Sequence, residues 1–125
     1  MLVVSLAAQA QKFSSELFSD ELKSLVVCRN GDDLQDPVIR IGSDEFVHIG
    51  FDLMSKQPRD YSYRIFHCNA DWTKTSTLTR MDYMQGFEDN PIEEYESSFN
   101  TTFDYTHYSL AIPNENVQLL LSGNY

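Results

Sequence analysis

The chain has 125 residues, of which 42% are hydrophobic and 13% aromatic, and its 19 acidic against 9 basic residues give a formal net charge of −10. A chain of this length forms one domain with a hydrophobic core, and its apolar content excludes intrinsic disorder. The negative charge repels nucleic-acid phosphates and anionic membrane surfaces, so we expect neither as a partner.

The first ten residues resemble the second half of a secretory signal peptide. Met1 to Ala10 contains a short apolar run and then small residues in an Ala-x-Ala arrangement that ends at Ala10. The run is too short to span a bilayer, because a membrane helix needs about 20 apolar residues. We therefore expect an exported protein, with residues 1–10 as the signal remnant and 11–125 as the domain. A buried N-terminal strand is the alternative.

Export would permit one disulfide bond, because the chain has only two cysteines, Cys28 and Cys68. The sequence does not show whether their Cα atoms come within bonding reach. Two separate buried thiols are the alternative interpretation.

Apolar residues recur at a spacing of two along the first half of the chain, which is the period of a β-strand. The clearest strand is 46–53, whose alternate positions are apolar: Val47, Ile49, Phe51 and Leu53. A helical turn or irregular lead-in is expected at 13–22. Shorter strands are predicted at 25–28 and 38–41, separated by the turn 30–33.

The second half alternates between strands and one long unpatterned segment. After a loop at 56–60, a strand is predicted at 61–68. Residues 69–106 are polar, acidic and aromatic with weak periodicity, so we expect a long irregular insertion of the kind that carries function or packs back on the domain. Alternation returns at 108–112 and 117–121, with a turn between them and another at 122–125.

Short strands at turn-punctuated spacing predict an all-β fold, specifically an antiparallel sandwich of the immunoglobulin or fibronectin type. The last turn leads toward a further strand, and a sandwich that stops there would leave an unpaired edge. We therefore expect the sandwich to be incomplete at its C-terminus and the chain to be the N-terminal part of a longer protein.

Metal, cofactor and catalytic chemistry are not indicated by the motifs. His67 and Cys68 are adjacent in a predicted strand, so their side chains would leave on opposite faces, and no Cys-x-x-Cys or His-Glu-x-x-His spacing exists. No Gly-x-Ser-x-Gly elbow is present, and the five glycines do not cluster into a phosphate-binding loop. We expect no metal, no cofactor and no catalytic residue.

The irregular segment holds the side chains that are candidates for a binding site. They are three aromatic residues and five acids: Trp72, Tyr83, Phe87, Glu88, Asp89, Glu93, Glu94 and Glu96. The rings would suit a carbohydrate-binding module if they were coplanar and exposed, and the acids would suit a glycosidase if two of them faced each other about 5–10 Å apart in a cleft. A small apolar core under the loop and an acidic solvated surface are the simpler interpretation.

The middle of the chain resembles one known family through motifs that occur in order. These are Gly50–Leu53, Tyr61–Tyr63, His67–Trp72, Tyr83–Phe87, Ile92–Tyr95, Ser98–Thr101, Tyr105–Tyr108, Ile112–Glu115 and Ser122–Tyr125. The run His67–Trp72 (His-Cys-Asn-Ala-Asp-Trp) and the stretch from Tyr105 to Glu115 are the most specific. The series, which spans residues 39–125, resembles the N-terminal domain of the type IX secretion system plug protein, found in Bacteroidota.

The resemblance implies a periplasmic protein that is not an enzyme. Members of the family associate with a giant outer-membrane translocon barrel and close its periplasmic mouth when no cargo passes; they are several times longer than this chain. No family motif assigns contact residues. The eight residues named above are our expected partner contacts, because aromatic anchors usually carry interface energy. A packing role is the favoured alternative for the motif residues.

Overall fold

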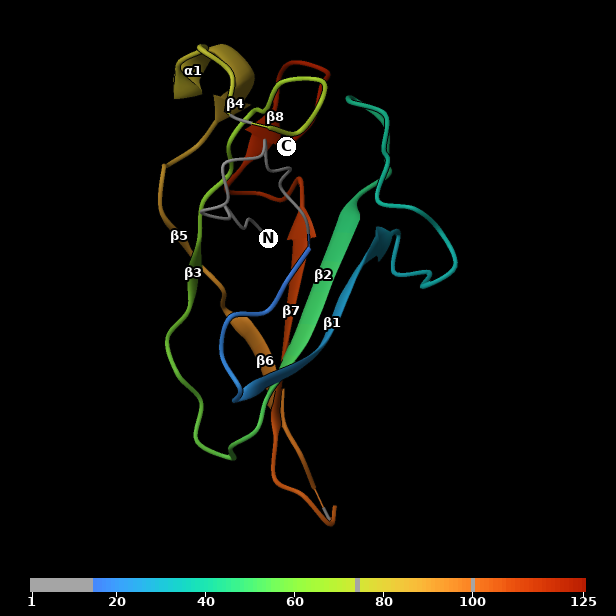
Figure 1. Ribbon diagram of the computed structural model, residues 1–125, viewed down its shortest axis with the longest axis vertical. Helices are drawn as coiled ribbons and strands as arrows, with labels where there is room; N and C mark the ends of the chain where they lie inside the picture. The colour runs from blue at the N-terminus through green and yellow to red at the C-terminus, as the bar shows by residue number, and fades with distance from the viewer. Residues whose placement is uncertain (1–14, 74, 100) are drawn as a thin grey trace.

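The computed structural model describes residues 15–73, 75–99 and 101–125, so the predicted signal remnant lies outside the described residues (Figure 1). The long strands form one antiparallel four-stranded sheet in the order β1-β2-β7-β6. Their bounds are β1 Leu22–Arg29, β2 Val47–Leu53, β6 Glu94–Ser97 and β7 Thr106–Ile112. β1 and β6 are therefore the two edge strands of this sheet, and β2 and β7 are its central strands.

Short strand pairs and one short helix complete the described secondary structure. β3 (Ser62–Tyr63) pairs with β5 (Asn90–Pro91), and β4 (Met84–Gln85) pairs with β8 (Gln118–Leu119); helix α1 is Arg80–Tyr83. Figure 1 shows β3 and β5 alongside the large sheet, with α1, β4 and β8 at one end. The predicted all-β, antiparallel fold is confirmed, and its assignment to the immunoglobulin or fibronectin type stays a prediction.

One core cluster joins the large sheet to the segments around β3 and β5. Phe51, Leu53 and Tyr108 are buried, with Tyr61 and Ile92 packed against them. The rings of Phe51 and Tyr108 are stacked, with centroids 5.2 Å apart, and the edge of Tyr61 meets both rings. Burial of this aromatic surface stabilises the packing of the segments around β3 and β5 against the large sheet.

A second core cluster lies under α1, β4 and β8. Tyr83, Met84 and Val117 are buried there. Gly86, which follows β4, has φ +127°, and a Cβ on it would overlap the backbone carbonyl oxygen of Asn116. The close approach of these two backbone segments therefore requires glycine at this position.

The strand predicted at 38–41 is wrong, since this segment lies in the connection between β1 and β2 and forms no strand. Its backbone groups are bound by local turns and by side chains instead of by a neighbouring strand. The Arg29 guanidinium donates to the carbonyl of Val38 at 3.1 Å, and the amide of Arg40 donates to Glu45 Oε1 at 3.0 Å. Apolar alternation alone did not reveal this local competition.

Other predicted bounds also changed. The strand at 25–28 extends to Leu22–Arg29, those at 61–68 and 117–121 shrink to two residues each, and 46–53 and 108–112 agree closely with β2 and β7. The segment 69–106 is not irregular throughout, because it holds α1, β4, β5 and β6. β6 has an almost wholly polar sequence and is a strand because its backbone pairs with β7.

Both cysteines are buried and free, which corresponds to the interpretation as two separate thiols. Cys28 is 1% and Cys68 is 2% exposed. Burial raises the pKa of the Cys68 thiol. Within the described part of the chain, no helix is long and apolar enough to cross a membrane.

Candidate partner-binding surface

The run His67–Trp72 is held in place by the C-terminal end of the chain. The His67 ring hydrogen-bonds with Ser76 Oγ at 3.0 Å and with the carbonyl of Ser122 at 3.1 Å. The Asn124 amide donates to the carbonyls of Asn69 and Ala70, both at 3.1 Å. Two of the motifs that carry the family resemblance are therefore joined to each other, and their polar side chains serve the fold.

The same junction explains the glycine in the last motif. Gly123 has φ +143°, and a Cβ there would overlap the His67 ring. That ring also meets the edge of the Tyr125 ring, with centroids 5.1 Å apart at 89°. The backbone conformation and the ring contact together favour glycine at this position.

The three candidate rings have different environments. Tyr83 is 5% exposed and its hydroxyl donates to the carbonyl of Ile65 at 3.2 Å, whereas Phe87 is 78% exposed. Trp72 is half-buried and has a positive φ of 62°. None of the ring contacts among the described residues joins two of these three rings. They do not form the coplanar exposed platform that a carbohydrate-binding module would need.

Phe87 is one of three exposed apolar side chains in and around α1, of which the sequence analysis named only Phe87. The Arg80 guanidinium donates to the carbonyl of Gly86, which holds α1 beside the turn that leads to Phe87. Leu78 and Met81, from the same region, are 40% and 75% exposed. We name Leu78, Met81 and Phe87 the α1 apolar patch. Burial of three apolar side chains of this size is a common anchor for a protein partner.

A shallow pocket of about 240 Å³ lies next to this patch. It is lined in part by His67, Arg80, Tyr83 and Glu88. Burial raises the pKa of the Tyr83 phenol. Of the five predicted acids, Glu88 alone lines this pocket, so the pocket does not hold the pair of these carboxylates that glycoside hydrolysis requires.

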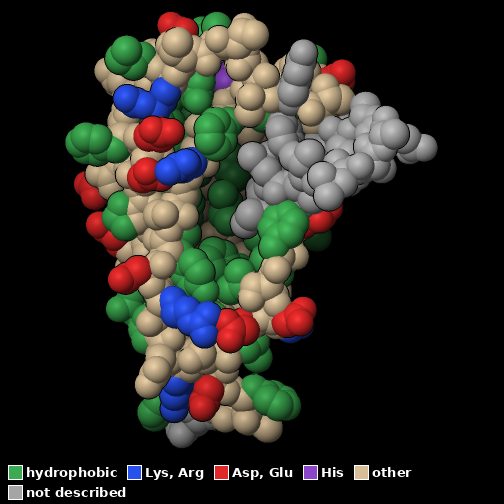
Figure 2. Space-filling view, turned by 60° about the vertical axis from the view of Figure 1, so that its left-hand side comes forward, with side chains coloured by type: hydrophobic (Ala, Val, Ile, Leu, Met, Phe, Trp, Pro, Cys, Tyr) green, Lys and Arg blue, Asp and Glu red, His purple; other side chains and the backbone are tan. Residues whose placement is uncertain are grey.

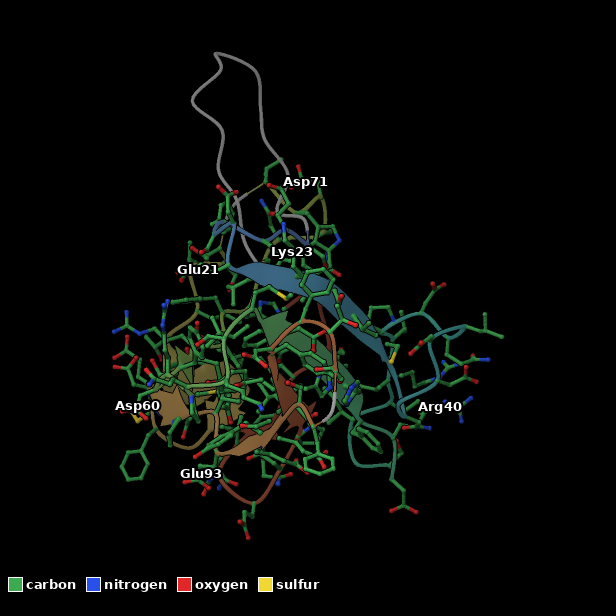
Figure 3. The ribbon with its side chains drawn as sticks, turned by 90° about the horizontal axis from the view of Figure 1, so that it is seen from below. Glu21, Lys23, Arg40, Asp60, Asp71 and Glu93 are labelled. Carbon is green, nitrogen blue, oxygen red and sulfur yellow. The ribbon has the colours of Figure 1, made fainter. Side chains whose placement is uncertain are left out.

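The five acids are exposed and fall into two groups. Glu88 and Asp89 follow Phe87, and Asp89 accepts two hydrogen bonds from the Arg64 guanidinium, which lowers the pKa of the Asp89 carboxyl. Glu93 lies between β5 and β6, and Glu94 and Glu96 lie in β6. Figure 3 shows Glu93 and Asp60 on the side of β3 and β5, away from Arg40 in the β1–β2 connection. The acids thus extend from the α1 apolar patch toward the sheet edge.

Two further exposed aromatic side chains were missed by sequence reasoning. Phe99 and Phe103 are 83% and 72% exposed at the turn between β6 and β7. The sequence holds no signal for them, because the same residue types fill the core elsewhere. Among the described residues, no group of three or more His, Cys, Asp and Glu side chains is arranged to hold a metal ion.

The structure is an all-β domain in which motif residues such as His67 and Asn124 hold segments of the fold together, and in which Phe87 and the five acids are exposed. The family model described as type 9 secretion system plug protein, first domain, matches residues 22–125. The chain belongs to this family. Among curated proteins, none matches the chain.

A crystal structure of a hypothetical protein from Parabacteroides merdae ATCC 43184 is similar to this chain, with a TM-score of 0.86. The two are 37% identical over 90% of this chain. The chain spans 28% of the length of that protein.

Proposed function

We propose that this chain is a periplasmic component of the type IX protein secretion system that binds and plugs the outer-membrane translocon barrel. The observation that carries the proposal is the family match over 22–125, which includes the scaffold and the aromatic, acidic segment. The role is protein binding without catalysis. Export through a signal peptide, of which residues 1–10 are the remnant, and a host among the Bacteroidota belong to the same proposal.

The proposed contact surface is the α1 apolar patch together with the exposed acids of the predicted set. Phe87 is the central anchor because it combines a large ring with 78% exposure. Figure 2 shows several acidic side chains along one margin of the molecule, close to exposed apolar groups. An apolar anchor with a charged rim is the usual anatomy of a protein interface. Tyr83 is buried, so its role in this proposal is to support the patch from below.

The test is affinity capture from the native host, with a tag placed at the chromosomal locus so that the whole natural protein is recovered. Co-purification of a very large outer-membrane barrel is the expected result. Recovery of the protein without such a barrel, or with polysaccharide, would overturn the proposal and favour a carbohydrate-binding β-sandwich module instead.

A matched pair of variants tests the contact surface. Phe87→Ser removes the proposed anchor, and Phe18→Ser removes a ring that is 62% exposed outside the segment 69–106. Loss of one interface anchor costs about 2 kcal/mol or more, which corresponds to a roughly 30-fold weaker complex. Barrel recovery should fall for Phe87→Ser alone. Equal recovery with both variants would remove Phe87 from the interface.

A further inference from the structure

The outer face of the large sheet carries polar side chains that the proposed function does not use. Phe51 and Leu53 of β2 point into the core, so the alternate residues His48, Gly50 and Asp52 point to the opposite face. The register pairs Asp52 with His107 of β7, and their side chains meet on that outer face.

The two imidazole rings converge over Gly50. A Cβ built on Gly50 would lie 3.2 Å from His48 Nε2 and 3.5 Å from His107 Nε2. The two nitrogen atoms therefore approach one common position above the sheet, from adjacent strands and from residues far apart in the sequence. The lack of a side chain at Gly50 leaves that position open.

Both Nε2 atoms are available as ligands. His107 Nδ1 is 2.6 Å from Asp52 Oδ1, so the carboxylate orients the ring and leaves Nε2 directed away from it. His48 makes no hydrogen bond or ion pair within the described ranges. A histidine that binds a metal through one ring nitrogen usually donates the other N–H to a carboxylate, which fixes the ring and raises its basicity.

We propose that His48 and His107 bind one divalent transition-metal ion of the zinc type through their Nε2 atoms, with Asp52 as the residue that positions His107. Imidazole nitrogen suits zinc and copper, whereas calcium and magnesium require oxygen ligands. Two protein ligands leave the remaining coordination positions to water. This site is additional to the proposed secretion role and does not depend on it.

The charge of the outer face agrees with a cationic ligand. Glu94 is the cross-strand partner of Ser109 and Glu96 is that of His107, so both carboxylates lie on the same face as Asp52. Lys23, the partner of Asp52 on β1, is a positive charge on that face. The carboxylates therefore outnumber the ammonium group around the two rings, which favours a metal dication.

The binding test uses the purified chain, zinc chloride as the probe and two measurements. Isothermal titration calorimetry should show saturable binding of one ion per chain. NMR of the ring nitrogens should show shifts for His48 and His107 but not for His67, whose two nitrogens already bond with Ser76 and Ser122. Absence of saturable binding, or shifts at His67 in place of the other two, would overturn the proposal.

Variants separate the roles of the residues. His48→Gln or His107→Gln should abolish saturable binding, and Asp52→Asn should weaken it by about 10–100-fold. Gly50→Ala should also weaken binding while keeping both ligands, because its methyl group would enter the position between the rings. Cys68→Ser should bind zinc as the unmodified chain does, since Cys68 lies outside the large sheet, where it pairs with Thr75 and Asn124. Circular dichroism confirms that each variant is folded, and unchanged affinity in both histidine variants would contradict the assignment.

Discussion

Removal of the Tyr108 hydroxyl group tests how the large sheet is joined to the segment before β3. The Tyr108 side chain is fully buried, at 0% exposure. Its hydroxyl accepts a hydrogen bond from the Arg59 amide at 2.7 Å and donates one to the Arg59 carbonyl at 2.8 Å. One side chain of β7 thus satisfies both backbone groups of a residue in the loop between β2 and β3.

The expected loss follows from these two hydrogen bonds. A typical hydrogen bond contributes about 0.5–1.5 kcal/mol to stability, so Tyr108→Phe should lower the free energy of unfolding by about 1–3 kcal/mol. The ring stays in place, so its stacking on Phe51 at 5.2 Å is kept and no large cavity forms. The effect therefore reports the hydroxyl group and not the aromatic core.

Urea denaturation of the purified chain, followed by circular dichroism and by fluorescence of Trp72, measures this loss. The midpoint should fall while the slope with urea stays the same. Tyr95→Phe is the matched control, because Tyr95 is 51% exposed and its hydroxyl makes no hydrogen bond within the described residues. Its stability should change by less than about 0.5 kcal/mol. Hydrogen exchange should also show loss of protection at the Arg59 amide in Tyr108→Phe. Equal stability of the two variants would refute the reasoning.

Three further predictions concern single side chains. Burial raises the pKa of the Cys68 thiol, which is 2% exposed, so a thiol reagent should modify it only after unfolding; rapid modification of the native chain would contradict this. The hydrogen bond and charge of Arg64 lower the pKa of the Asp89 carboxyl, so the folded state favours its ionised form. The stability that this ion pair contributes is therefore present above the pKa of Asp89 in the unfolded chain. It is lost as the pH falls through the lower pKa of the folded state. NMR titration should show that pKa rising toward about 3.9 in Arg64→Ala, and no change would exclude the ion pair. Gly86→Ala and Gly42→Ala both place a side chain at positive φ, which costs about 1–2 kcal/mol each. Only the Cβ of Gly86→Ala also overlaps a backbone carbonyl. Thermal melts should therefore show Gly86→Ala to be less stable than Gly42→Ala by about a further 1–3 kcal/mol.

Sequence patterns were most reliable where one face of a strand is buried. The alternation in 46–53 predicted β2 because Phe51 and Leu53 occupy the core. The same reasoning failed at 38–41, where side chains of Arg29 and Glu45 bind the backbone. It also missed β6, since a polar edge strand has no alternation and exists only through its pairing with β7.

The residues of the candidate surface were likewise predicted only in part from the sequence. The sequence identified the aromatic and acidic residues of the segment 69–106, but residue type does not distinguish a buried ring from an exposed one. Tyr83 and Phe87, four positions apart, differ from 5% to 78% in exposure. The exposed Phe99 and Phe103 at the β6–β7 turn had no signal at all.

The sequence by itself determined the all-β class, the two central strands and the family resemblance, because these depend on local periodicity and on motifs that read along the chain. The tertiary structure alone decided which rings are exposed, that Cys28 and Cys68 stay apart, and that His48 and His107 meet over Gly50. Each of these depends on strand register, which brings together residues distant in the sequence. Register is set by the packing of the whole sheet, and no local stretch of sequence contains it.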